Sequence, residues 1–188
     1  MKRTLCIGDS NTYGYDPRPF LGGRYPRGVR WTGLLERSGR QVFNCGENGL
    51  SIPRQRELPA ATALVRSFLP LDEVVVMLGS NDLLEGASPE EAEARMEPLL
   101  RCIRKNADGA RLVLIAPPPM VPGTWVDGPA LIERSQRLGA VYRRLAERLG
   151  VDFADAGEWG AALAFDGVHL LPEGHAAFAG GLLKVLEE

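Results

Sequence analysis

The stretch RTLCIGDS, residues 3–10, joins a short apolar run to a turn that carries a nucleophilic hydroxyl group. The apolar residues from Leu5 to Ile7 predict a short buried strand, and Gly8-Asp9-Ser10 predicts a turn at its carboxyl end. Open α/β sheets bind their ligands at this edge. The pattern therefore predicts that Ser10 lies where a sheet of this class holds its functional groups.

Apolar runs of the same kind recur along the chain, with helical patterns between them. The runs at residues 74–78 and 112–115 lack an alternation of polar and apolar residues, which is typical of strands covered on both faces. Alternating strands and helices indicate a parallel, doubly wound α/β sheet in a single domain, residues 1–188. The predicted strands are Thr4–Ile7, Gln41–Asn44, Glu73–Leu78, Arg111–Ala116 and Val151–Ala154; the predicted helices are Trp31–Arg37, Arg54–Phe68, one beginning at Ser88-Pro89, Pro129–Leu149 and Leu171–Leu186.

Composition and charge restrict the class of protein. The 188 residues are 45% hydrophobic and 24% charged, and the net charge of −2 gives no electrostatic reason to expect a nucleic acid or an anionic membrane as partner. No apolar stretch approaches the roughly 20 residues that span a bilayer, and the first residues lack the apolar segment of a signal peptide. Cys6, Cys45 and Cys102 are odd in number and form no paired metal-binding motif. We therefore expect a cytoplasmic protein without disulfides.

A second motif, Asp166-Gly167-Val168-His169, lies between the last predicted strand and the last predicted helix. A short turn can hold Asp166 against one imidazole nitrogen of His169 while the other nitrogen faces Ser10, as in serine hydrolases. His175 is the only competing histidine, and we assign it a structural role because no acid neighbours it in a short turn. Two other interpretations of the Ser10 turn stay open: an ordinary strand-ending turn, and a phosphate-binding loop of a flavodoxin-like domain.

Two further strand ends supply groups suited to a developing negative charge. Asn81 follows the third predicted strand, and its side-chain amide is a neutral hydrogen-bond donor. Gly49 follows the second strand, and a glycine amide can approach a substrate closely because no Cβ intervenes. With the Ser10 amide these groups form a candidate oxyanion hole. Turn and cap roles are the simpler interpretation of each residue alone, and Asp82 fits a helix cap.

Taken together, the motifs resemble the ordered blocks of the SGNH hydrolases, also called GDSL-type esterases and lipases. Gly8-Asp9-Ser10 resembles the first block, and Gly49, five residues after Asn44, resembles the glycine of the second. The third block corresponds to residues 79–82 and the last to residues 166–169. Residues 30–35, 69–72 and 116–119 are similar to the small arylesterase and acyltransferase branch of this family.

The resemblance implies a three-layer α/β/α sandwich of flavodoxin-like form, with a five-stranded parallel sheet of order 2-1-3-4-5. It also implies a serine esterase that cleaves short-chain acyl or aryl esters through an acyl-serine intermediate, with transfer of the acyl group to alcohols as a further activity. In this mechanism His169 deprotonates Ser10, and the amides of Ser10 and Gly49 with the Asn81 side chain hold the oxyanion. No metal or organic cofactor is required.

Two long loops, residues 11–30 and 117–128, follow strands and are expected to overhang the functional edge. Tyr13, Trp31 and Trp125 lie in or beside them and are the predicted substrate-binding residues; packing of these rings onto the sheet is the alternative. A carbohydrate acetylesterase or an acyl thioesterase would use the same catalytic groups. A flavodoxin-like ligand-binding domain is the alternative outside enzymes. The expected partner is a small-molecule ester, and a homo-oligomer stays open.

Overall fold

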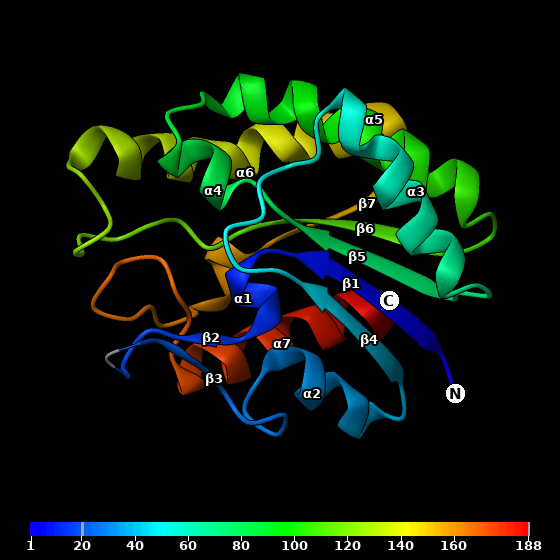
Figure 1. Cartoon of the computed structure of the whole chain (residues 1–188), viewed down its shortest axis with the longest axis horizontal. Coiled ribbons are helices and arrows are strands. Elements are labelled where there is room, and N and C mark those ends of the chain that lie inside the picture. Colours follow the sequence, from blue (N-terminus) through cyan, green and yellow to red (C-terminus); the bar gives the residue numbers. More distant parts are fainter. Residues whose placement is uncertain (20, 188) are drawn as a thin grey trace.

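The computed structural model describes residues 1–19 and 21–187; Phe20 of the first predicted loop and Glu188 of the predicted domain lie outside the described residues. Its centre is a parallel five-stranded sheet in the order β4-β1-β5-β6-β7 (Figure 1). Numbered among themselves in chain order, these strands lie in the order 2-1-3-4-5, which confirms the predicted topology. The strands are β1 (Arg3–Gly8), β4 (Gln41–Gly46), β5 (Glu73–Met77), β6 (Arg111–Ala116) and β7 (Asp152–Asp155).

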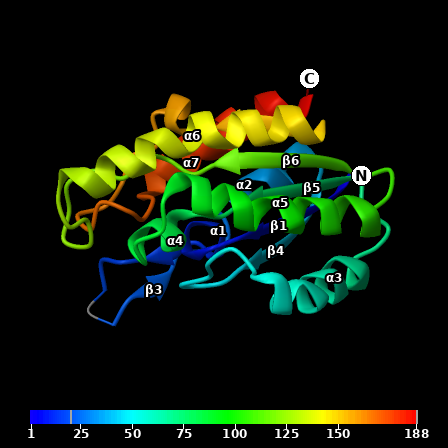
Figure 2. The same ribbon diagram turned by 90° about the horizontal axis from the view of Figure 1, so that it is seen from above.

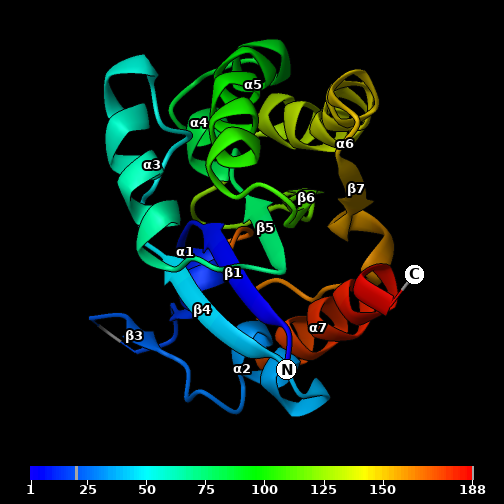
Figure 3. The same ribbon diagram turned by 90° about the vertical axis from the view of Figure 1, so that its right-hand side faces the viewer.

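Helices cover both faces of this sheet and complete the predicted three-layer sandwich. Helices α3, α5 and α6 lie on one face, and α2 and α7 lie on the other (Figures 1 and 3). Seen from above, α5 and α6 run beside each other over the sheet (Figure 2). The helices are α1 (Ser10–Tyr13), α2 (Trp31–Leu35), α3 (Leu58–Ser67), α4 (Ser80–Leu84), α5 (Pro89–Asn106), α6 (Pro129–Leu149) and α7 (Pro172–Glu187), with 3-10 turns η1 (Glu36–Ser38), η2 (Gln55–Glu57) and η3 (Ala156–Trp159).

The strands separate two hydrophobic cores, because successive side chains of a strand point to opposite faces. Val74 and Val76 of β5 belong to the core beneath α3, α5 and α6. Val75 of the same strand belongs to the other core, together with Trp31 of α2 and Phe178 of α7. Burying an aliphatic side chain of this kind contributes about 1.5–3 kcal/mol. Burial on both faces explains the unbroken apolar runs in the sequence.

Helix signals in the sequence proved accurate at the ends of the long helices. The Ser88 hydroxyl accepts a hydrogen bond from the Glu91 amide at 3.1 Å, and the Glu91 carboxylate accepts one from the Ser88 amide at 2.7 Å. This reciprocal pair is a capping box, followed by Pro89 in the first turn. Gly150 ends α6 in the left-handed conformation, with φ of +63°.

Some short elements were not predicted. The expected loop at residues 11–30 holds most of α1, which begins at Ser10, and a two-stranded antiparallel hairpin of β2 (Tyr15–Asp16) and β3 (Gly23–Arg24). The helix expected at residues 54–68 divides into η2 and α3, with a proline in the first turn of α3. Within residues 1–19 and 21–187, no helix combines the length and the apolar composition needed to cross a membrane.

Candidate active site

The turn after β1 places a hydroxyl group at the carboxyl edge of the sheet. Asp9 precedes α1 in an extended conformation, and its carboxylate accepts a hydrogen bond from the Asn11 amide at 2.9 Å. Ser10 is therefore the first residue of α1, with its side chain almost fully buried. A Cβ on Gly8 would lie 2.1 Å from the Thr12 hydroxyl oxygen, so the strand can pass this close to α1 only without a side chain.

Three side chains from the two predicted motifs meet at this edge. His169 Nε2 lies 2.9 Å from Ser10 Oγ, and His169 Nδ1 lies 2.7 Å from Asp166 Oδ2. All three side chains are buried. The carboxylate fixes one imidazole nitrogen as a donor, which leaves the other free to accept the serine proton. The arrangement has the geometry of a nucleophile, a general base and an orienting acid.

The loop around Asp166 is built to keep its carboxyl group ionised. Asp166 Oδ1 accepts hydrogen bonds from the backbone amides of Val168 at 2.9 Å and His169 at 3.0 Å. Burial alone would raise the pKa of Asp166, but the imidazole and these two amides outweigh it and hold the pKa below its ordinary value. The carboxylate is thus available to stabilise an imidazolium.

The overhanging loop at residues 117–128 supports this arrangement through its backbone. The amides of Val121, Thr124 and Trp125 donate to the carbonyl groups of residues 167, 165 and 166. A Cβ on Gly123 would lie 2.3 Å from the Asp166 backbone, so a glycine is needed for this approach. The loop therefore holds the acid of the triad in addition to covering the edge of the sheet.

Asn11 is a functional residue that the sequence interpretation missed. Its side-chain amide donates to the Val168 carbonyl at 3.0 Å, and its oxygen accepts from the Leu170 amide at 2.9 Å. Asn11, which follows Ser10, thus bonds the backbone on both sides of His169. In the sequence, Asn11 could be noticed only as an amide side chain next to the nucleophile. Asparagine is common in turns, so its presence there does not indicate a function.

One candidate oxyanion donor, Asn81, contacts the β4–η2 loop that carries another, Gly49. Asn81 Nδ2 donates to the carbonyl of Leu50 at 3.0 Å, which joins α4 to the residue after Gly49. A side-chain amide carries two hydrogens, so Asn81 retains a second one for a substrate oxygen. Gly49 is exposed, has φ of +75° and lines a surface cavity of about 390 Å³. The structure therefore brings Asn81 and the Gly49 loop together, while the bond from each to a substrate oxygen stays a prediction.

Asp82 does not cap a helix, which corrects the sequence interpretation. The residue that precedes α4 is Gly79, with φ of +125°, and Asp82 lies inside the helix and is fully buried. Its carboxylate accepts hydrogen bonds from the Ile52 amide at 2.9 Å and from Arg95 at 2.7 Å. Asp82 therefore fixes the same β4–η2 loop that Asn81 contacts.

Two aromatic rings flank the imidazole of His169. The ring centroid of Tyr15 lies 4.7 Å from that of His169, and the ring of Trp125 lies nearly perpendicular to it at 4.9 Å. Trp125 is 51% exposed, so it contacts the triad and also presents a free surface to solvent. Its predicted place at the substrate site is compatible with this position.

Trp31 was predicted to bind substrate, and the structure contradicts this. Its side chain is 0% exposed, its indole nitrogen donates to the Asn11 carbonyl at 3.0 Å, and its ring packs against Phe178. It begins α2 on the side that faces the sheet, so it is a core residue. Tyr13 is half-buried beneath the guanidinium of Arg24, 4.0 Å from the ring centre, and its role in substrate binding stays a prediction.

Two buried titratable groups outside the triad, Asp9 and His175, have shifted pKa values. Burial raises the pKa of Asp9 to about 6, although the Asn11 amide and the charge of His169 oppose the rise. His175 is fully buried, and its Nδ1 accepts a hydrogen bond from the Trp31 amide at 3.4 Å. This contact supports the structural role predicted for His175. Burial, with a smaller contribution from Arg30, lowers the pKa of His175 to about 4.

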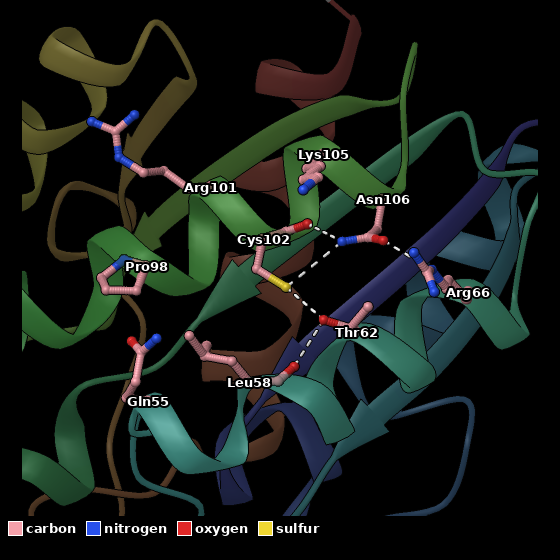
Figure 4. Close-up of a pocket in the computed structure, with 9 residues that line it drawn as sticks. All are labelled: Gln55, Leu58, Thr62, Arg66, Pro98, Arg101, Cys102, Lys105 and Asn106. Atoms are coloured by element: carbon pink, nitrogen blue, oxygen red, sulfur yellow. Dashed lines mark hydrogen bonds between the residues drawn. The ribbon is translucent and has the colours of Figure 1, made fainter.

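A cavity of about 460 Å³ opens between α3 and α5, and its lining residues include none of the triad (Figure 4). Its polar side chains pair with one another: Cys102 contacts the Thr62 hydroxyl, and Asn106 bridges Cys102 and Arg66. We therefore do not assign this cavity to the catalytic groups. Among the described residues, no cluster of three or more His, Cys, Asp or Glu side chains could hold a metal ion.

Comparison with known proteins agrees with this geometry. The sequence model of the GDSL-like lipase/acylhydrolase family matches residues 6–177. A structure of a protein classed as an arylesterase from Agrobacterium tumefaciens str. C58 is 33% identical, with a TM-score of 0.87 over 100% of this chain and 99% of that one. The native aryl esterase of M. smegmatis is 26% identical, with a TM-score of 0.86 over 100% and 99%.

A carbohydrate acetylesterase family member from Sinorhizobium meliloti is similar to the same extent. It is 28% identical, with a TM-score of 0.88 over 100% of this chain and 98% of that one. No curated protein gave a significant sequence match. The similarity to these solved structures extends over the whole chain.

Proposed function

Since this chain belongs to the GDSL-like lipase/acylhydrolase family, the SGNH hydrolases, it is a carboxylic ester hydrolase, and we propose that its substrates are esters of short acyl chains or aryl alcohols. Membership of this family of enzymes argues against the earlier alternative, a flavodoxin-like ligand-binding domain without catalytic activity. The single observation that carries the proposed mechanism is the continuous chain of contacts from Ser10 Oγ through His169 to Asp166, at 2.9 and 2.7 Å.

In the first half of the proposed reaction, Ser10 Oγ attacks the ester carbonyl while its proton passes to His169 Nε2. The resulting imidazolium is stabilised by the Asp166 carboxylate, which the backbone amides keep ionised. The negative charge on the substrate oxygen is held by the amides of Ser10 and Gly49 and by the second hydrogen of Asn81. A single donor of this kind contributes about 100- to 1000-fold to the rate in other hydrolases.

Collapse of this intermediate releases the alcohol, which takes the proton from His169, and leaves an acyl-Ser10 ester. A water molecule then gives a proton to His169 and attacks the acyl carbonyl. The bond between the acyl group and Ser10 Oγ breaks, Ser10 Oγ takes the proton back from His169, and the acyl group leaves as the carboxylic acid. An alcohol in place of water would yield a new ester. The balance between these two acceptors depends on how well the apolar rim of the site excludes water.

The rim supports the choice of a short or aryl ester. The Trp125 ring contacts that of His169 in a T-shaped arrangement, and Val121 and Phe165 on the two neighbouring loops are exposed apolar side chains. Backbone hydrogen bonds join these loops, so all three residues lie in segments paired with the backbone around Asp166. Apolar surface in this position favours an acyl or aryl group over a highly charged one.

The test of the mechanism is the substitution Ser10→Ala. We expect hydrolysis of p-nitrophenyl acetate to fall by at least about 1000-fold, because within the described residues Ser10 is the hydroxyl that bonds the imidazole. The matched control is Ser67→Ala, which removes an exposed hydroxyl on α3 that bonds only within its helix. A fluorophosphonate should label wild-type protein at Ser10 and leave Ser10→Ala unlabelled. Normal turnover by the alanine variant would refute the assignment.

A carbohydrate acetylesterase is the second candidate, because the carbohydrate acetylesterase family member from S. meliloti is about as similar as the arylesterases. Acetylated sugars, aryl acetates and acyl thioesters all present the same carbonyl to Ser10. Comparing kcat/KM for the three classes discriminates between them. We expect aryl acetates to be preferred; a clear preference for acetylated sugars or for thioesters would replace the short-chain or aryl ester with that substrate.

A further inference from the structure

A cavity of about 280 Å³ lies between the β2–β3 hairpin, α2 and β4, on the same side of the sheet as α7 (Figures 1 and 3). Three arginines, Arg24, Arg27 and Arg30, line it together with a single carboxylate, Glu36. Three positive charges and one negative charge leave a net charge of +2 around the cavity. Such a concentration of like charge destabilises the empty site.

The three arginines differ in how their charge is compensated. Arg27 forms two hydrogen bonds to the Glu36 carboxylate, both at 2.6 Å. Arg24 donates to the Tyr13 carbonyl at 2.9 Å and stacks on the Tyr13 ring, but neither contact supplies a negative charge. Arg30 is the most poorly satisfied, because its Nε is buried without a hydrogen-bond partner among the described residues. Burial, followed by repulsion from Arg24 and Arg27, lowers the pKa of Arg30.

A hydroxyl group adds a further donor to the cavity wall. Thr32 lines the cavity and accepts a hydrogen bond from Asn44 Nδ2 at 2.8 Å. Because the Thr32 oxygen is the acceptor in this bond, its own hydrogen can point to a ligand. The wall thus offers one hydroxyl group and two guanidinium groups that pair with no carboxylate in the described part of the chain; all three can donate hydrogen bonds.

We propose that this cavity binds a phosphoryl group, as inorganic phosphate or as a phosphate monoester. A phosphate dianion matches the net charge of +2, and guanidinium groups bind phosphate oxygens in pairs of parallel hydrogen bonds. The guanidinium of Arg30, which has no carboxylate partner among the described residues, gains an anionic one. This site goes beyond the ester hydrolysis described above, and its occupancy does not depend on the catalytic groups.

The cavity adjoins the back of the short helix that begins with the nucleophile. Asn44 donates to the Thr12 carbonyl at 2.7 Å, and Arg24 donates to the carbonyl of the next residue, Tyr13. The aliphatic part of Arg30 packs on Gly14, where a Cβ would lie 2.3 Å from Arg30 Cδ. A bound phosphate that orders these side chains would therefore also stabilise α1.

The test measures thermal unfolding of the full chain against the concentration of inorganic phosphate, at constant ionic strength held with sodium chloride. We expect Tm to rise by a few degrees and to saturate, as for a ligand that binds only the folded state. The rise should be lost in Arg30→Met and kept in Arg137→Met, which removes an exposed arginine that pairs with Glu90. A phenyl phosphate arm reports whether an ester is accepted as well as free phosphate.

A second measurement needs no variant, in case Arg30→Met does not fold. Phenylglyoxal modifies accessible arginines, and mass spectrometry gives the rate at each position. We expect phosphate to slow modification of Arg30 several-fold and to leave Arg137 unchanged. The proposal is overturned if phosphate and sodium chloride raise Tm equally, if Arg30→Met shows the same saturating rise, or if phosphate protects Arg30 and Arg137 alike.

Discussion

Asn11 carries no chemistry in the proposed reaction, yet its side chain sets the distance between nucleophile and base. One amide group satisfies the buried Val168 carbonyl and Leu170 amide, on either side of His169. A buried backbone group that loses its partner costs about 1–3 kcal/mol. The position of His169 against Ser10 therefore depends on a residue that touches neither the substrate nor the imidazole.

We predict that Asn11→Ala lowers the free energy of unfolding by about 2–4 kcal/mol, because two buried backbone groups lose their partners. We also expect kcat to fall by at least about tenfold, because small displacements of catalytic groups are costly. Chemical denaturation and steady-state hydrolysis of an aryl acetate measure the two effects.

The control for Asn11→Ala is Asn106→Ala, which also removes an asparagine that bonds a backbone carbonyl, at the far end of α5. It should leave kcat unchanged. The prediction fails if Asn11→Ala keeps the wild-type kcat, or if Asn106→Ala loses as much activity.

Residues with a reactive or ionisable side chain in a recognisable motif could be predicted from the sequence. Residues that act through packing or through hydrogen bonds to distant backbone could not. Ser10 and His169 stand beside predicted strand and helix ends, and parallel strands bring such ends to one edge. For Asn11 the partners lie 157 and 159 residues away, and nothing local indicates them. Trp31 was misassigned because an aromatic residue beside a loop gives no information about which way its ring points.

At the scale of elements, the position of Asn81 depends on the start of the short helix α4. Gly79 precedes this helix, and no other residue can replace it without strain. Gly79 has φ of +125°, outside the regions that L residues adopt readily. A Cβ there would also lie 2.7 Å from the hydroxyl of Tyr142, which donates to the Leu78 carbonyl. The end of β5 and the start of α4 are thus packed against α6 without space for a side chain.

We predict that Gly79→Ala destabilises the protein by about 2–4 kcal/mol, through backbone strain together with the contact to Tyr142. Activity should fall with it, because Asn81 lies two residues further along α4. The matched control is Gly109→Ala, where φ is also positive at +80° but no atom lies near the new Cβ. This control should cost about 1–2 kcal/mol from strain alone. Equal losses for the two variants, measured by chemical denaturation, would show that the contact with Tyr142 has no effect.

The five strands of the sheet and helices α2, α6 and α7 were predicted within one or two residues, whereas α1 and the β2–β3 hairpin were missed for a physical reason. The buried runs of β5 and β6 and the apolar side of α6 extend over enough residues to set a period. Helix α1 and the β2–β3 hairpin have no period of their own, since glycine conformations and distant contacts define them. Strand β4 extends two residues beyond its prediction because Gly46 pairs with Gly8 of β1.

At the scale of the whole molecule, the two ends of the sheet have different buried charges. At the amino end, Glu73 is buried and bonds Thr4, Lys2 and Arg40, and these contacts outweigh burial to lower its pKa. At the carboxyl end, burial dominates and raises the pKa of Asp9. The sequence placed both acids at strand ends but could not predict this difference, because the partner cations are distant in the chain.

Asp9 and His175 have opposite effects on stability between pH 4 and pH 6.5. The pKa of Asp9 rises from 3.8 to about 6 on folding, so its contribution to stability is complete below pH 3.8 and is lost as the pH rises through 6. The pKa of His175 falls from 6.5 to about 4, so its contribution is complete above pH 6.5 and is lost as the pH falls through 4. Each shift corresponds to about 3 kcal/mol. Asp166, whose pKa is lowered from 3.8, loses its contribution below this range.

We therefore predict that the wild-type free energy of unfolding changes little between pH 4 and pH 6.5, because two opposing slopes cancel. In Asp9→Asn only the histidine slope remains, so stability should rise with pH by about 3 kcal/mol across this range. In His175→Gln only the carboxyl slope remains, and stability should fall by a similar amount. The double variant should be flat again, which controls for any constant loss from either substitution. Urea denaturation at half-unit pH intervals measures all four curves, and parallel curves for the wild type and both single variants would contradict this account.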